Sequence, residues 1–350
     1  MRAMAAVTRF FHPVLRARDL RDRPVQVRLD GERYALWRGA DGSLGAVVDR
    51  CPHRFAPLSA GEVRSDGRLA CPYHGWRFDR DGRGQSPSQP GLSRCDVRAM
   101  QAVERYGAIW IADRDVPLDR LPNIERPGFE HAGVFVEQFM CPLHVALDNF
   151  SEDEHTPWVH TRLGWLERDT PILDFAAENH DDRTEVRYRA IQRPSQLSRF
   201  FGIRPGDHFH NEWVTRFDPV RSEYLISWTD PSGETQRPAQ LLAPIFMTPQ
   251  DAQSTLFVVF MLAKLDAPYL RRLRPLVHRG ATALIRREIR DDAVFVPNVA
   301  DTPFAMKGMR LGRFDKPLIH NHRLLERLYW GESYDEHSAR LRERAAGPNQ

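Results

Sequence analysis

The chain has 350 residues, which is enough for two domains that each bury a core. Its apolar fraction of 41% and charged fraction of 28% are those of an ordinary globular protein. The 50 basic and 47 acidic residues are spread along the chain and leave a net charge of only +3, which argues against a nucleic-acid-binding protein.

Short runs of β-forming residues, separated by Gly and Asp turns, fill the chain up to about residue 117. They include residues 26–31, 34–39, 44–48 and 106–112. This pattern predicts a small all-β domain with functional loops at its hairpin tips.

Two of these loops each offer one thiol and one imidazole. Cys51 and His53 belong to the first loop, and after seventeen intervening residues Cys71 and His74 belong to the second. This pairing suits a [2Fe-2S] cluster in which thiolates bind one iron and imidazoles bind the other. A Cys2His2 zinc site is the alternative, although such sites usually space Cys with Cys and His with His. At these residues the chain resembles a Rieske protein.

The remaining cysteines and the absence of long apolar runs indicate the cellular compartment of the protein. Cys95 and Cys141 are expected to be small buried thiols in a reducing compartment, with a disulfide between them as the alternative. No run approaches the length of a membrane span, and the N-terminus is too short and too interrupted for a signal peptide. The sequence therefore predicts a soluble, cytoplasmic protein.

A proline-rich passage from Pro117 to Pro127 predicts the boundary between a first domain, residues 1–117, and a second, residues 118–350. In the second domain, residues 142–158 have helical spacing and residues 183–265 read as strands. A long helix is expected from about Pro268 to Val296, ended by Pro297. The fold class is therefore α+β.

The segment from Asp148 to His160 is the second concentration of metal-binding residue types. Two imidazoles and one carboxylate on one face of an iron leave positions open for dioxygen and substrate, as in non-haem Fe(II) oxygenases. His155 and His160 could supply the imidazoles.

The carboxylate is expected from the late helix. Asp292 lies at helical spacing from Ile285 and Ile289, on an otherwise apolar face, where a carboxylate needs a strong partner such as a metal. Asp291 is the alternative, but it shares a face with Glu288 and is more easily solvated.

Together the two motifs resemble the terminal oxygenase, or α subunit, of a Rieske non-haem iron oxygenase. In that family an Asn is followed by an acid after three residues, a His after three more and a second His five further on, and the residues that fit are Asn149, Glu152, His155 and His160. The resemblance implies that both His bind a mononuclear Fe(II) and that Asn149 lies close to it. The family usually has Asp as the bridging acid, whereas Glu152 holds that position here; Asp153 is the alternative, but on a helix it would point away from His155.

The resemblance also implies partners and a reaction. It implies a helix-grip-like catalytic domain with a central antiparallel sheet, and a homotrimer in which Glu152 bridges a cluster His and an iron His across the interface. The chain has no Gly-rich dinucleotide motif, so electrons from NAD(P)H are expected from a separate reductase or ferredoxin. The expected activity is hydroxylation, as a mono- or dioxygenase, or dealkylation of a small, mainly apolar organic substrate. The alternative is a Rieske-type electron carrier without oxygen chemistry of its own.

Several further residues have structural or pocket roles to be tested. His208 and His210 are expected to be surface or pocket polar groups, His12 a structural residue, and residues 340–344 part of a solvated terminus. Aromatic candidates for the pocket are Trp158, Trp165, Phe201, Phe209, Trp228, Phe246 and Phe260.

Overall fold

The computed structural model describes residues 6–89, 95–160, 173–192 and 201–346. The chain divides into two compact units: unit 1 comprises residues 1–122, 248–252 and 335–350, and unit 2 comprises residues 123–247 and 253–334. The predicted division between residues 117 and 118 stays a prediction about separate domains.

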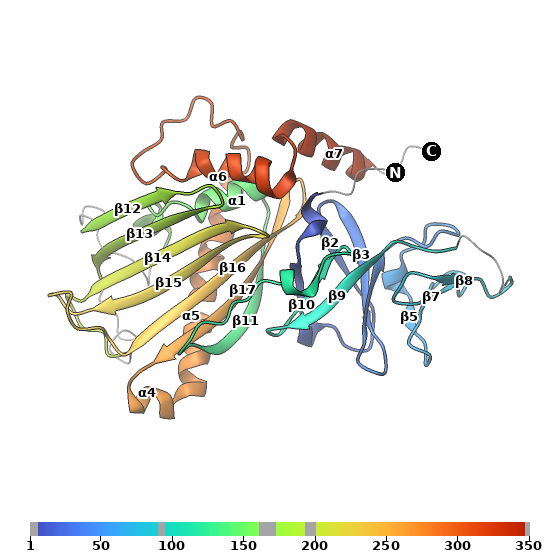
Figure 1. The fold of residues 1–350 in the computed structure, drawn as a ribbon, viewed down its shortest axis with the longest axis horizontal. Coiled ribbons are helices and arrows are strands. Elements are labelled where there is room, and N and C mark those ends of the chain that lie inside the picture. The colour runs from blue at the N-terminus through green and yellow to red at the C-terminus, as the bar shows by residue number, and fades with distance from the viewer. Residues whose placement is uncertain (1–5, 90–94, 161–172, 193–200, 347–350) are drawn as a thin grey trace. The chain divides into compact units, whose positions relative to one another are not determined.

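Unit 1 is built from two antiparallel sheets (Figure 1). The larger has the order β1-β10-β9-β4-β3-β2, with the bounds His12–Arg16, Ala108–Ala112, Ala99–Arg105, Leu44–Val48, Glu32–Arg38 and Val25–Leu29. The smaller has the order β5-β6-β7-β8, with the bounds Glu62–Val63, Leu69–Ala70, Arg77–Phe78 and Gly84–Gln85. The described part of unit 1 also has 3-10 turns: η1 (Ala6–Arg9) before β1, η2 (Ala17–Asp19) and η3 (Leu58–Ala60) between strands, and η4 (Leu118–Arg120) after β10. The predicted all-β character of this part is confirmed.

Two arginines of the C-terminal helix α7 (Tyr334–Ala346) bind a buried carboxylate of unit 1. Asp30 is fully buried, and its Oδ2 accepts hydrogen bonds from Arg340 Nη1 at 2.5 Å and Arg344 Nη1 at 2.8 Å. The prediction that these arginines belong to a solvated terminus is therefore wrong. Sequence spacing could not show it, because the partner lies about three hundred residues away in the chain.

Unit 2 contains a seven-stranded antiparallel sheet with the order β11-β17-β16-β15-β14-β13-β12 (Figure 1). In that order the bounds are Glu130–Phe139, Ser254–Leu265, Ala239–Asp251, Val220–Thr229, His208–Phe217, Arg183–Ile191 and Asp174–Asn179. Residues 256–262 of β17 are buried throughout, as their continuous apolar sequence predicts for a strand covered on both faces. The predicted α+β fold with a large antiparallel sheet is confirmed.

The helices of unit 2 are α1 (Leu143–Asn149), α2 (Thr156–Val159), α4 (Pro268–Arg272), α5 (Arg274–Phe295) and α6 (Leu318–Leu324), with the short elements η5 (Val296–Val299) and η6 (Leu325–Trp330). Helix α5 packs against β11 and β17, behind the sheet in Figure 1. Its predicted inward face is confirmed, because Ile285, Ile289 and Asp292 are all buried.

Two predicted helices are interrupted. The helix expected over residues 142–158 stops at Asn149, where Ser151 Oγ donates to the Leu147 carbonyl at 2.7 Å, and helical structure resumes only at Thr156. The helix expected from Pro268 breaks at Leu273, because Pro275 in the first turn of α5 has no N–H to continue the ladder.

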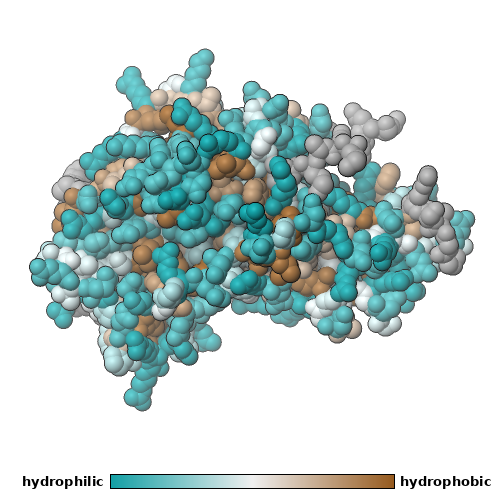
Figure 2. Space-filling view, in the orientation of Figure 1, coloured by the Kyte–Doolittle hydropathy of each residue, from teal (hydrophilic) through white to brown (hydrophobic). Residues whose placement is uncertain are grey.

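Among the described helices, none has the length and apolarity needed to cross a lipid bilayer. Hydrophilic residues cover most of the face shown in Figure 2, with hydrophobic residues in small groups between them.

Candidate metal centres

The two loops predicted to hold a cluster share one backbone conformation. In each, the Cys N–H donates to the carbonyl five residues on, and the N–H of the fourth residue donates back to the Cys carbonyl. The bonds are Cys51 N to Ala56 O (2.9 Å), Phe55 N to Cys51 O (2.8 Å), Cys71 N to Trp76 O (2.7 Å) and Gly75 N to Cys71 O (3.1 Å). The fourth residue has a positive φ in both loops, 59° at Phe55 and 67° at Gly75. The two loops therefore share one backbone fold and place their Cys equivalently, while the His follows Cys51 by two residues and Cys71 by three.

The thiols and imidazoles of these loops form two separate pairs. Cys51 and Cys71 are buried free thiols in the core of unit 1, and burial raises the pKa of Cys51 to about 11. His53 and His74 are exposed, with ring centroids 4.5 Å apart. No three donor atoms of these four described residues lie within 4.8 Å of one another, so they do not surround a single ion. Two pairs suit a two-iron cluster better than one zinc ion.

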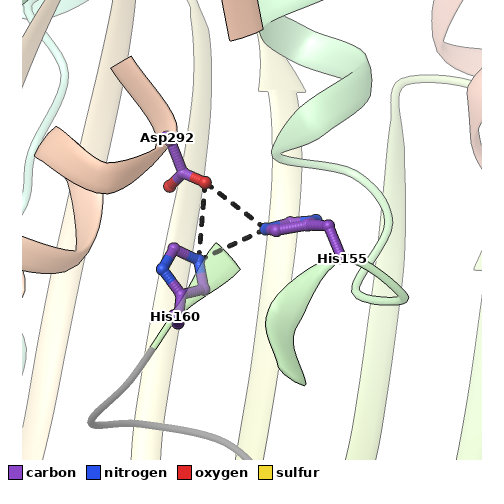
Figure 3. A group of neighbouring side chains, drawn as sticks. All are labelled: His155, His160 and Asp292. Atoms are coloured by element: carbon purple, nitrogen blue, oxygen red, sulfur yellow. Dashed lines mark hydrogen bonds and ion pairs between the residues drawn. The ribbon is translucent and has the colours of Figure 1, made fainter. Parts of the chain in front are cut away.

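The second predicted group comes together in unit 2 (Figure 3). His155 Nε2 lies 3.3 Å from His160 Nε2, and Asp292 Oδ1 lies 3.5 Å and 3.4 Å from these two nitrogens. The centre of a triangle with such sides is about 2 Å from each corner, an ordinary metal–ligand distance. The three donor atoms therefore fit one divalent cation.

The charge of this group also suits a cation. Asp292 is 3% exposed, its Oδ1 makes no hydrogen bond among the described residues, and burial raises its pKa to about 7. Burial lowers the pKa of His155, but the carboxylates of Glu152, Asp292 and Asp153 together outweigh this effect and raise it to about 9. A bound cation would replace these protons and satisfy the buried carboxylate.

Glu152 contacts His155, but not through the helical geometry that the sequence predicted. Its Oε1 lies 2.5 Å from His155 Nδ1, while its Oε2 accepts hydrogen bonds from the backbone N–H groups of Glu154 (2.5 Å) and His155 (3.4 Å). The helical-face argument for this contact was wrong, because residues 150–155 are not helical. Glu152 instead closes a turn in front of α2, and Asp153 points elsewhere.

Glu288 on α5 is a site residue that sequence reasoning missed. It is buried, and its Oε2 lies 3.7 Å from His160 Nδ1. Glu288 lies one helical turn before Asp292 and is buried as Asp292 is, whereas Asp291 is more exposed. Asp291 instead pairs with Arg287, at 3.5 Å, and lies outside the triad. Glu288 lies four residues before Asp292, and this spacing could have identified it from the sequence.

A cavity of about 100 Å³ adjoins His155, His160 and Asp292. It is of the order of an engineered cavity that admits a benzene-sized ligand. Asn149 lines it, and its amide lies close enough to lower the pKa of Asp292, although burial has the larger and opposite effect. Its apolar walls come from the sheet and from α5: Phe209, Ile226, Ala243, Ile245, Ile285 and Ile289.

Of the aromatic residues suggested for the pocket, Phe209 lines the cavity, whereas Trp158 is 60% exposed. Trp165 lies outside the described residues. Phe201, Trp228, Phe246 and Phe260 are buried but do not line it. His208 and His210 lie on β14 apart from the triad, and His210 Nε2 is 2.9 Å from Thr229 Oγ1.

Comparison with known proteins supports the description of the cluster loops. The model of the Rieske [2Fe-2S] domain matches residues 10–101, which implies a [2Fe-2S] cluster. Chlorophyllide a oxygenase of Oryza sativa subsp. japonica is 32% identical over 163 residues, 45% of this chain and 30% of that protein. The vanillate O-demethylase oxygenase subunit of a Pseudomonas species is 37% identical over 155 residues, 42% of this chain and 46% of that protein. The chain thus spans less than half the length of these curated relatives.

A solved structure extends the likeness to the whole fold. Dicamba monooxygenase with non-haem iron and dicamba superposes with a TM-score of 0.70 at 22% identity, covering 96% of this chain and all of that one. The resemblance to Rieske non-haem iron oxygenases drawn from the sequence motifs is confirmed.

Proposed function

We propose that this chain, which contains a Rieske [2Fe-2S] domain and has the fold of Rieske oxygenases, is the oxygenase component of such a system. In this proposal it hydroxylates or dealkylates a small, mainly apolar organic substrate. The observation that carries the proposal is the triangle of two partly buried histidines, His155 and His160, and the buried Asp292 beside a cavity with apolar walls. An electron carrier would have no use for either feature.

Each centre would be held by residues of one unit. Cys51, Cys71, His53 and His74 would hold the cluster, and His155, His160 and Asp292 would hold a mononuclear Fe(II). When bound, the cluster would supply electrons and the iron would activate dioxygen. Neither the cluster nor the iron can both supply electrons and activate dioxygen.

The surrounding acids would orient the iron ligands. Glu152 at His155 Nδ1 favours the tautomer whose Nε2 lone pair faces the metal, and Glu288 lies on the Nδ1 side of His160. Asn149 would hold the Asp292 carboxylate from the side. The apolar walls would exclude water and hold the substrate next to the ligand triangle.

The remaining elements of the proposal concern partners. A separate NAD(P)H-dependent reductase or ferredoxin would reduce the cluster. A homotrimer, with Glu152 as the bridging acid between neighbouring centres, and a cytoplasmic location stay predictions.

Two variants separate the oxygenase from the electron carrier. His160→Ala should keep the brown colour and the Rieske spectrum, but lose chelatable iron and at least tenfold in substrate-dependent oxygen uptake when NADH and a surrogate reductase supply electrons. Cys71→Ser should lose the colour and the uptake together. Unchanged uptake in His160→Ala, with its cluster intact, would refute the oxygenase and favour the carrier.

A further inference from the structure

Residues 268–276 of unit 2 expose more apolar surface than their packing within the chain explains. They comprise α4, the break at Leu273 and the beginning of α5, and Leu270 is the one buried residue among them. Tyr269 is 47% exposed, Leu273 41% and Leu276 62%. The exposed side of a surface helix is ordinarily polar, and a group of neighbouring exposed apolar side chains marks an interaction surface.

The same stretch of chain is strongly basic. Residues 267–287 contain no acidic residue but six arginines: Arg271, Arg272, Arg274, Arg279, Arg286 and Arg287. Near the exposed apolar side chains, Arg271 Nη2 lies 3.8 Å from Asp266 Oδ1, and Arg274 Nη1 lies 2.7 Å from Glu130 Oε2. Arg272 and Arg279 are exposed and form no ion pair with another described residue. The surface around residues 268–276 therefore carries an excess of positive charge.

The place of this segment suits contact with an extended surface. In Figure 1, α4 lies at the edge of unit 2, beyond the strands of the seven-stranded sheet. A lipid bilayer accommodates projecting Leu and Tyr side chains among its headgroups, while arginines beside them bind the lipid phosphates. An acidic protein would match the arginines, but it would also need a groove shaped for the projecting side chains. The observations therefore favour a membrane surface.

We propose that residues 268–276 dock the protein on a membrane surface that contains anionic lipids. Tyr269, Leu273 and Leu276 enter the headgroup region, and the arginines between them bind lipid phosphates. Because the segment is short and its charges are exposed, the binding is reversible and weakened by salt. The inference goes beyond the proposed function and does not depend on it.

Vesicle binding tests the inference without turnover. The full-length protein, loaded with both metal centres, should bind vesicles of equal parts phosphatidylglycerol and phosphatidylcholine about tenfold more tightly than vesicles of phosphatidylcholine alone at low salt. Salt at about 0.5 M should remove most of this preference. Hydrogen exchange should become slower in residues 268–276 when the anionic vesicles are added.

Two double variants separate the contributions of charge and apolar surface. Arg271→Gln with Arg272→Gln should weaken binding to the anionic vesicles roughly thirtyfold, at about fivefold for each arginine. Leu273→Ser with Leu276→Ser should weaken it about tenfold, because less apolar surface enters the headgroup region. None of the four residues is a proposed metal ligand, so both variants should keep the Rieske EPR signal and the chelatable iron.

Matched controls come from unit 1. Leu118→Ser replaces a leucine that is 60% exposed, and Arg21→Gln with Arg23→Gln removes two exposed arginines. Both controls should bind the anionic vesicles nearly as the wild type does. Controls that lose binding as strongly as the variants in residues 268–276 would overturn the assignment of the segment.

The wild type alone can also refute the inference, whatever the variants do. Equal binding to both kinds of vesicle, or slower exchange only outside residues 268–276, would overturn it. Binding to soluble polyglutamate but not to the vesicles would replace the membrane with an acidic protein partner. Slow exchange in residues 268–276 before vesicles are added, together with self-association in solution, would show that a second copy of the chain covers the segment and would likewise overturn the inference.

Discussion

Metal binding at the ligand triangle should release protons, because two of its groups hold protons in the metal-free protein. The pKa of His155 is about 9 and that of Asp292 about 7. A metal ion needs both groups deprotonated. Affinity should therefore rise with pH, about tenfold per unit between pH 7 and 9, where His155 alone still carries its proton, and more steeply below pH 7.

Glu152→Gln isolates the contribution of His155. Glu152 makes the largest contribution that raises the pKa of His155, ahead of Asp292 and Asp153, so its replacement should lower that pKa, which burial also lowers. Anaerobic titration calorimetry of iron-depleted protein with Co²⁺, in buffers of different ionisation enthalpy, counts the protons released. At pH 8 the variant should release fewer protons than the wild type, and its affinity should depend less on pH between 7 and 9.

Glu154→Gln, which changes an exposed acid in the same segment, is the matched control and should behave as the wild type. Equal proton release from wild type and Glu152→Gln at pH 8 would contradict the assignment of Glu152 as the partner of His155.

Three further predictions concern stability. Burial lowers the pKa of His12 to about 3 and that of His144 to about 4, so both imidazoles stay neutral in the folded protein, while the unfolded chain takes up more protons below pH 6.5. In urea unfolding, the free energy of unfolding should therefore fall by about 2 kcal/mol for each His between pH 6.5 and 5. The fall should be smaller in His12→Gln, and a flat pH profile would refute the prediction. Gly75 has a φ of 67°, so Gly75→Ala should destabilise the protein by about 1 kcal/mol. The Cβ added by Gly280→Ala meets no atom within 4 Å, so this variant should stabilise α5 by a similar amount, and opposite shifts of the denaturant midpoints would contradict these backbone effects. Asp30→Ala should cost about 3 kcal/mol and make α7 sensitive to limited proteolysis, and an unchanged cleavage rate would show that the arginine contacts do not hold the helix.

Most of the correct predictions about the site came from residues that lie close together in the sequence. The pairing of Cys51 with His53 and of Cys71 with His74 reflects two loops with the same backbone hydrogen bonds, a relation that short-range sequence can show. Asp292 was identifiable because it interrupts an apolar helical face, which is buried as expected. In both cases one element alone sets the position of the side chain.

Other features depend on contacts that spacing does not encode. The break after Asn149 arises from Ser151 and Glu152 bonding to nearby backbone groups, a competition that helical periodicity ignores. Glu288 was missed because a helical wheel does not show that His160 approaches from another element. The burial of Asp30 depends on α7, at the far end of the chain.

The central claim is that one chain holds both a Rieske cluster and a separate mononuclear iron. The most direct test combines iron and acid-labile sulfide analysis with EPR of the dithionite-reduced, anaerobically reconstituted protein, before and after mild chelation. The account predicts a Rieske-type signal that survives chelation, and iron in excess of sulfide that chelation removes in the wild type and that His155→Ala lacks. A reduced protein without that signal, or with iron equal to sulfide throughout, would contradict it.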